Sequence, residues 1–555
     1  MLPVHRADGD VPAPDPHAVP DADAPSAASW DELVTSALLG TDRRPPAPGL
    51  APGTQDAPRA LLDAAALHTV RRRAGLSPAP AAALPGRAPD DPRPLLPPAA
   101  ELRLAQLLAD RTAPSGGRRG AAPDLTELIP QWLTTANRRG FRPPAVLLPA
   151  LLDAARARTD LRPNALAFAG ARGLWLAALN PEWKFALRDS ARRERTGVPD
   201  PEATRRVWEE GLFAERVALL AAIRSADPAG ALALLVSTWS GERAEDRLMF
   251  LDSLRTGLSA PDEEFLEQAL SDRSRNVRAT AAELLSALPE SALGARMAAR
   301  ARSCVHLDRT GGGASIAVEA PHECDTAMQH DGVTATPPSG RGERDWWLGQ
   351  LVEATPLATW SERFGSRTPQ EIVALPVADG WTDSLHAAWC RAAVRQRDTV
   401  WARALLGAPT TPPTQGTGTA SLAERAKLLA TLPHAERADW VAGFIAAHGL
   451  SEAFQLLGVC TVPWSGALGS AVVDALDIAR DAGSYPWSFS GVMGLAERCL
   501  DPGEADRLSV LTAAQDEQED ASPGADGYWS EAFQRLVSTL RLRAAMETEL
   551  TPVAL

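Results

Sequence analysis

Residues 262–289 read DEEFLEQALSDRSRNVRATAAELLSALP, and this stretch decides the expected fold. Its second half has apolar residues at helical spacing. These are Val277, Ala281, Leu284, Leu285 and Leu288. A shorter helix precedes them, and we expect Asp272 in the turn to cap the second helix. We also expect Arg278 to reach a neighbouring repeat. The stretch therefore predicts two packed antiparallel helices.

The preceding stretch, residues 227–258, has the same design and starts 35 residues earlier. Each stretch opens with an acidic cap, and the second resembles a HEAT repeat. One helix pair cannot cover its own apolar face, so several pairs must stack. The sequence therefore predicts an all-α fold, a HEAT-like α-solenoid.

Composition shifts along the chain predict two helical lobes and several connectors. We expect a disordered, Pro-rich tail at 1–28 and a β-hairpin near 302–320. The predicted divisions are an N-terminal lobe at 29–301, the hairpin with a connecting loop at 302–343, and a C-terminal lobe at 344–555. The predicted linkers are Pro-rich at 45–58, 77–98 and 111–123, and flexible at 407–420.

The charge of the chain limits its partners. The formal net charge is −14, and Lys184 and Lys427 are its only lysines. Such a balance excludes a binder of nucleic acid over its whole surface, because the average field repels phosphate. The five cysteines form no Cys-x-x-Cys pair, which is typical of reduced thiols in a cytoplasmic protein. No apolar run is long enough to predict a membrane span.

The motifs of common catalytic and cofactor sites are missing from the sequence. Neither lysine lies in a Gly-Lys-Ser/Thr phosphate loop, and no His-Glu-x-x-His or Gly-x-Ser-x-Gly motif occurs. We therefore expect no cofactor and a protein that is not an enzyme.

One short span raises the question of a metal site, with Cys304, His306, His322 and Cys324 as weak candidates. Residues two apart on a strand share a face, which would pair Cys304 with His306. A hairpin turning near residue 312 would place His306 opposite Val318. His322 would then lie roughly 13 Å further along the strand, too far for a tetrahedral zinc. We therefore expect a packed loop without a metal.

The basic segment 131–198 holds twelve basic residues against five acidic ones. It includes the candidate binding residues Arg138, Arg139, Arg142 and Arg172. Solvated helix faces are the simplest interpretation; a positive groove for an acidic partner or nucleic acid is another. A contact with the acidic segment 501–531 is the third.

Four further residues are candidates for binding. Arg43 and Arg44 follow a predicted helix, where cations complement the helix dipole. Trp346 and Trp347 are adjacent and cannot share one helix face. One of the two tryptophans is therefore expected at a seam between elements or on a binding surface.

Several phrases resemble a bacterial family known as domain of unknown function 5691. They are WDELVTSALLGTDRRP at 30–45, GLWLAALNPEW at 173–183, ECDTAMQHDGV at 323–333 and GERDWWLGQLVEATPL at 342–357. Members look helical and repeat-like, and they tend to be encoded beside a SWIM-type zinc-finger protein, a MoxR-like ATPase and a von Willebrand A-type protein. The resemblance implies a partner in an ATPase-linked assembly, such as the MoxR-like ATPase or the von Willebrand A-type protein.

The expected function is a non-catalytic, protein-binding scaffold built on helical repeats, because a solenoid offers extended surface without chemistry. One alternative is a nucleic-acid-associated protein that uses the 131–198 segment. Another is an enzyme whose acidic and histidine groups only the folded chain assembles.

Overall fold

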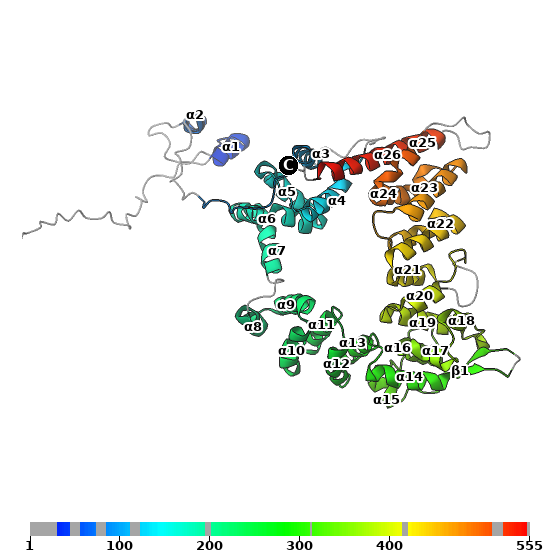
Figure 1. The fold of residues 1–555 in the computed structure, drawn as a ribbon. Helices are drawn as coiled ribbons and strands as arrows, with labels where there is room; N and C mark the ends of the chain where they lie inside the picture. Colours follow the sequence, from blue (N-terminus) through cyan, green and yellow to red (C-terminus); the bar gives the residue numbers. More distant parts are fainter. Residues whose placement is uncertain are drawn as a thin grey trace, which may run out of the picture. The chain divides into compact units, whose positions relative to one another are not determined.

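The computed structural model describes residues 30–44, 56–73, 85–110, 123–194, 201–310, 313–412, 420–512 and 525–551. These residues belong to two compact units, 1–87 and 88–555. Together they contain 26 α-helices and one two-stranded sheet, labelled in Figure 1. The chain is therefore all-α with a small β-hairpin, as the sequence predicts. The predicted tail at 1–28 lies outside the described residues.

The first unit contains two helices, α1 (Trp30–Leu39) and α2 (Ala57–Arg73). Leu33 of α1 is buried against Leu61 and Ala64 of α2. Gly40 ends α1 with a φ of 85°, a left-handed conformation that glycine adopts without strain.

The second unit begins with five helices and continues with a longer series. The first five are α3 (Pro98–Asp110), α4 (Leu125–Arg138), α5 (Leu148–Ala157), α6 (Arg162–Leu179) and α7 (Lys184–Glu194). The next eight are α8 (Pro201–Glu210), α9 (Phe213–Ala226), α10 (Pro228–Thr238), α11 (Ala244–Ser253), α12 (Glu263–Ala269), α13 (Arg275–Leu285), α14 (Ala292–Cys304) and α15 (Thr326–His330).

The series goes on to the C-terminal helix. Its members are α16 (Glu343–Ala354), α17 (Ala358–Arg363), α18 (Pro369–Val373), α19 (Thr382–Gln396), α20 (Thr399–Leu406), α21 (Leu422–Thr431), α22 (His434–Leu457), α23 (Gly466–Asp481), α24 (Ser490–Cys499), α25 (Ala505–Val510) and α26 (Ala525–Glu549). Short 3-10 helices lie between the α-helices of the whole second unit. They are Ala145–Leu147, Thr159–Leu161, Pro181–Trp183, Trp239–Gly241, Ala260–Asp262, Ala378–Gly380, Pro486–Phe489 and Pro502–Glu504. Within the described ranges, no helix is both long and apolar enough to cross a membrane.

Helices α3 to α6 form a bundle with its own core around Trp132 and Phe168, whose rings meet edge to face. The end of the Pro-rich stretch before α3 is fixed to this bundle. Arg93 binds Asp91 at 2.7 Å and donates to the carbonyl oxygens of Ala167 and Phe168 in α6. Hydrogen bonds therefore hold this connector in place, together with the burial of Leu96 in the core of the bundle.

Helices α8 to α25 share one continuous hydrophobic core with the first half of α26, running from Trp208 to Leu540. Neighbours in sequence pack on one another, as in the contacts of α12 with α13 and of α22 with α23. The segment predicted as a hairpin with a connecting loop, 302–343, contributes Val305, Ile316 and Val333 to the same core.

The pair α12 and α13 matches the helices predicted for 262–289. Val277, Ala281, Leu284 and Leu285 are buried, while Leu288 lies past the end of α13 and is only half-buried. The polar predictions for this pair need correction.

Asp272 does not occupy the N-cap of α13, which is Ser274; instead it accepts from the backbone N–H of Ser274 at 2.7 Å. Arg278 does not reach another repeat, because its Nη1 donates to the carbonyl oxygens of Asp272 and Arg273 in its own turn. Two other arginines span the helix pairs: Arg255 binds Glu283 through two hydrogen bonds of 2.9 and 3.0 Å, and Arg247 of α11 binds Asp272 at 2.8 Å.

Buried arginines close the ends of several helices. The last carbonyl oxygens of a helix have no partner inside it and must be satisfied by other donors. Arg543 donates to the carbonyls of Glu497 and Leu500 at the end of α24, and burial lowers its pKa. Arg437 donates to four carbonyls, three of them at the end of α21. Many arginines of this chain thus have a structural task.

The predicted hairpin forms from β1 (Val305–Asp308) and β2 (Ser315–Val318). The predicted register is wrong by one residue, because His306 lies opposite Ala317 and Val305 opposite Val318. The cause is the length of the connection between the strands. The last pair, Asp308 with Ser315, leaves six residues between them, whereas a turn centred on residue 312 would leave seven. The middle of the predicted glycine turn, residues 311 and 312, lies outside the described part of the chain.

The last helix, α26, belongs to two cores. Its residues up to Leu540 contribute Trp529, Phe533 and Leu540 to the long core, while Met546 near its end and Leu550 just after it lie in the α3–α6 bundle. Figure 1 shows α26 beside α3 and α4, which it contacts. Arg103 of α3 also binds Glu549 at 2.7 Å. One helix therefore joins the two ends of the second unit.

Candidate functional site

The predicted arginines lie in two separate units. Arg43 and Arg44 are exposed in the turn after α1, where their backbone N–H groups donate to the carbonyl of Gly40. In the second unit, Arg142 donates to the carbonyl of Arg93 and Arg172 to that of Pro89. Much of the basic segment is thus used to hold the chain together.

Arg138 and Arg139, at the end of α4, differ in their surroundings. Arg139 donates to the hydroxyl of Thr551 at 2.8 Å, close to the end of α26. Arg138 is exposed. The four arginines of this segment therefore form no common pair or cluster in the described structure.

The four metal candidates do not form a ligand set. Cys304 is the last residue of α14 and is buried, so it shares no strand face with His306. His322 is exposed and lies 3.8 Å from Glu319. Burial raises the pKa values of Cys304 and Cys324, which disfavours the thiolate that binds metals. Over the described ranges, no group of three or more His, Cys, Asp or Glu side chains could hold a metal ion.

The two adjacent tryptophans fix one loop to α16. The indole N–H of Trp346 donates to the carbonyl of Thr334, and that of Trp347 to the carbonyl of Ala335, both at 2.8 Å. Trp347 is buried, and Trp346 is half-buried beneath the guanidinium of Arg341. The two tryptophans therefore lie where helix α16 packs against the loop that contains Thr334 and Ala335.

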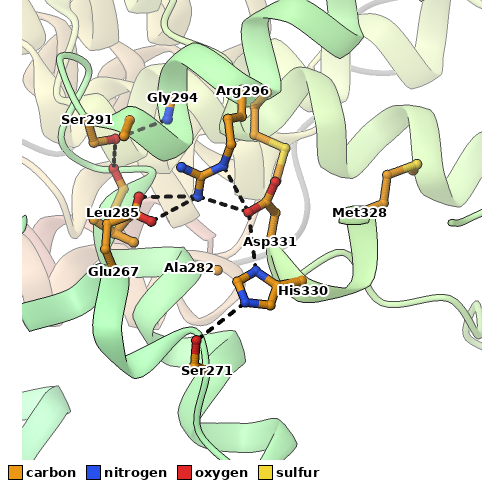
Figure 2. Close-up of polar contacts among 12 residues, drawn as sticks. Glu267, Ser271, Ala282, Leu285, Ser291, Gly294, Arg296, Met328, His330 and Asp331 are labelled. Carbon is orange, nitrogen blue, oxygen red and sulfur yellow. Dashed lines mark hydrogen bonds and ion pairs between the residues drawn. The ribbon is translucent and has the colours of Figure 1, made fainter. Parts of the chain in front are cut away.

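The segment ECDTAMQHDGV packs onto α12, α13 and α14, and Figure 2 shows its polar centre. Asp325 caps α15 by accepting from the backbone N–H of Met328 at 2.7 Å. Asp331 is 3% exposed and accepts from Arg296 and Arg300 of α14. Arg296 also binds Glu267 of α12. This motif thus joins three elements through one buried carboxylate.

Burial by itself would raise the pKa of Asp331. The hydrogen bonds from Arg296 and Arg300 outweigh that effect, so the pKa of Asp331 lies below its usual value. The group is an anion at neutral pH and serves as a structural counterion.

Next to this carboxylate, His330 lies between Ser271 and Asp331 (Figure 2), an order that resembles a catalytic triad. The His330 Nε2 is 3.4 Å from the Ser271 Oγ, and its Nδ1 is 3.8 Å from Asp331. The second distance exceeds a hydrogen bond, and Asp331 already binds two guanidinium groups. The arrangement lacks the histidine-orienting bond on which a triad depends.

A groove of about 1190 Å³ carries several charged groups. Its lining comes from the loop that follows α11 and from four helices of the long core with their ends, α13, α16, α19 and α21. Leu258, Leu284, Ala287 and Val394 supply its apolar part. A groove that crosses several packed helices offers an extended contact surface.

Two ion-pair networks line the groove. Arg255 binds Glu283, and these hydrogen bonds hold the pKa of Glu283 below its usual value. Further along, Glu353 of α16 binds Arg391 and Arg395 of α19. These networks fix the walls of the groove across neighbouring helices.

The groove also carries cations outside these networks. Arg397 and Lys427 are exposed, and neither forms an ion pair within the part of the chain described here. Altogether five cationic side chains and three carboxylates line the groove, a positive balance in a chain of net charge −14. The groove therefore favours an acidic occupant.

Cys390 also lines the groove, and burial raises its pKa to about 12. A thiol with so high a pKa is protonated at neutral pH and is a poor nucleophile. The side chain acts as part of the apolar wall.

Sequence reasoning missed the groove because its residues come from one loop and four helices between positions 255 and 427. In the sequence, the one feature that could have pointed to the groove was Lys427, because it is one of only two lysines in an arginine-rich chain.

The fold and this groove define an all-α protein of packed helices with an extended, charged surface. The chain belongs to the family described as "Family of unknown function (DUF5691)", which matches residues 32–550. No curated protein and no solved structure shows significant similarity to it.

Proposed function

We propose that the protein is a non-catalytic scaffold of HEAT-like helical repeats that binds another protein in the groove of α13, α16, α19, α21 and the loop after α11. The observation that carries this proposal is the positive groove across four helices of an acidic chain. The occupant is a segment of a partner protein with a surplus of carboxylates.

Arg397 and Lys427 are the anchors for such a segment. Arg397 ends α19 in a left-handed conformation, with a φ of 53°, so its side chain leaves the helix at a fixed point. The paired cations Arg391 and Arg395 are held by Glu353 and contribute less charge to a ligand. Acidic side chains gain most from cations that have no partner of their own.

The family resemblance suggests the first partners to test. These are a MoxR-like ATPase and a von Willebrand A-type protein, each offered as a purified protein. We place the complex in the cytoplasm, in agreement with five cysteines that form no disulfide.

The double variant Arg397→Glu/Lys427→Glu is expected to weaken partner binding about tenfold or more, because two attractive contacts become repulsive. Binding is measured with the purified partner, and cross-linking with mass spectrometry maps the contact on the wild-type chain. Weakening should be greatest at low salt, since salt screens exposed charges.

The matched control is Arg138→Glu/Lys184→Glu, which reverses one exposed arginine and one exposed lysine outside the groove lining. Equal loss in both variants, or cross-links that avoid the groove, would overturn the proposal. Capture of nucleic acid that is lost only in the control variant would favour the basic segment instead.

A further inference from the structure

A second, smaller cavity of about 210 Å³ lies between the start of α13 and the loop at 332–336. Arg275 and Arg278 line it from α13, and Gly332, Thr334 and Thr336 line it from the loop. It lies beside the motif centred on Asp331 and is separate from the groove described above.

One wall of this cavity is fixed by α16. The carbonyl groups of Thr334 and Ala335 accept from the indoles of Trp346 and Trp347, and the backbone N–H of Thr334 donates to Gln350 at 2.7 Å. These backbone groups are therefore already engaged, and the loop holds one position.

The opposite side is fixed by a glycine. Gly332 has a φ of 89°, and a Cβ atom there would lie 2.3 Å from the Cβ of Ala282 in α13. Only glycine permits both the left-handed backbone and this close approach. The loop therefore lies directly against α13.

The charge in the cavity is wholly positive. Its lining contains two guanidinium groups and no carboxylate. Asp272 and Asp331, which neighbour the lining in sequence, are engaged by Arg247 and by Arg296 with Arg300.

The two guanidinium groups differ in their freedom. Arg278 is oriented by its bonds to two backbone carbonyls of the preceding turn. Arg275 is exposed and forms no ion pair within the described ranges. The first turn of α13 adds the positive end of its dipole, and the side chain of Ser274 does not cap it.

We infer that this cavity binds a compact phosphate group, either free or on a small phosphorylated molecule. Guanidinium groups match phosphate oxygens with paired hydrogen bonds. The positive lining also attracts a doubly charged phosphate more strongly than a singly charged anion. The cavity, of about 210 Å³, has room for one phosphate group. Thr336, which also lines the cavity from the loop, carries a hydroxyl group that can donate.

The test is calorimetric titration of the full chain with inorganic phosphate and, separately, with glycerol phosphate. Arg275→Ala is expected to weaken binding about tenfold or more, because it removes one charge-assisted contact. The matched control is Arg273→Ala, which removes an exposed arginine two residues away that does not line the cavity.

Stronger binding of glycerol phosphate than of inorganic phosphate would assign the site to a phosphorylated molecule, and the reverse order would assign it to the free ion. Three results would overturn the inference: no binding of either, binding of succinate as strong as that of phosphate, or equal weakening in Arg273→Ala. The variant Arg397→Glu/Lys427→Glu should keep phosphate binding, which separates this site from the proposed scaffold function.

Discussion

Replacement of Asp262 by alanine is expected to lower the local free energy of unfolding by about 3–5 kcal/mol, because it leaves a buried guanidinium without its counterion. Asp262 and Arg224 form an ion pair in which both side chains are 1% exposed. Arg224 also donates to carbonyl groups of Thr256 and Pro228, which joins α9 to the helices that follow. The effect is measured by hydrogen exchange of residues 213–269.

The control for this prediction is Glu283→Ala. It breaks the Arg255–Glu283 pair, whose side chains are 45% and 42% exposed, and is expected to cost less than about 1 kcal/mol. Equal effects of the two variants would show that Asp262 is not a buried counterion. If Asp262→Ala does not fold, Asp262→Asn retains an acceptor for the N–H of Ser259 and allows the measurement.

The double variant Met546→Ala/Leu550→Ala is expected to open the α3–α6 bundle. Both side chains are nearly fully buried in that bundle, and truncation of a buried Met or Leu costs about 2–5 kcal/mol each. Amides of residues 125–179 should therefore exchange much faster in the variant. Protection of α9 to α23 should change little, because these two side chains lie outside the long core.

Val510→Ala is the matched control, since Val510 is 75% exposed at the end of α25. It should leave exchange unchanged throughout. Unchanged protection of residues 125–179 in the double variant would mean that the end of α26 contributes nothing to the stability of the bundle.

The local pattern of the sequence was enough to predict single helices and one hairpin. Apolar residues at helical spacing gave α13, and β-branched residues around a glycine turn gave β1 and β2. The predicted strand register was wrong because it depends on the exact length of the turn, and three consecutive glycines at 311–313 are compatible with more than one turn length. The predicted contact of Arg278 was also wrong, because a long side chain can reach several carbonyl groups and only the fold selects between them.

Candidate sites were harder to predict than helices. The sequence drew attention to clusters that are close along the chain, such as Cys304 and His306 or the arginines near 138. The groove and the phosphate cavity instead combine residues far apart, such as Arg255 with Lys427 and Arg275 with Thr336. The net charge of each site depends on which side chains form ion pairs with one another. Within the described structure, Arg275, Arg397 and Lys427 form none and keep their charge for a ligand.

The sequence by itself determined the all-α class, the helix pair at 262–289 and the membership of a family, because periodicity and motifs are local properties. Tertiary structure alone decided that α26 serves two cores and that Asp331 is a buried counterion. It also decided which cations remain for a ligand. The physical reason is that burial and charge pairing depend on distances between residues remote in sequence, which only the packing of the helices sets.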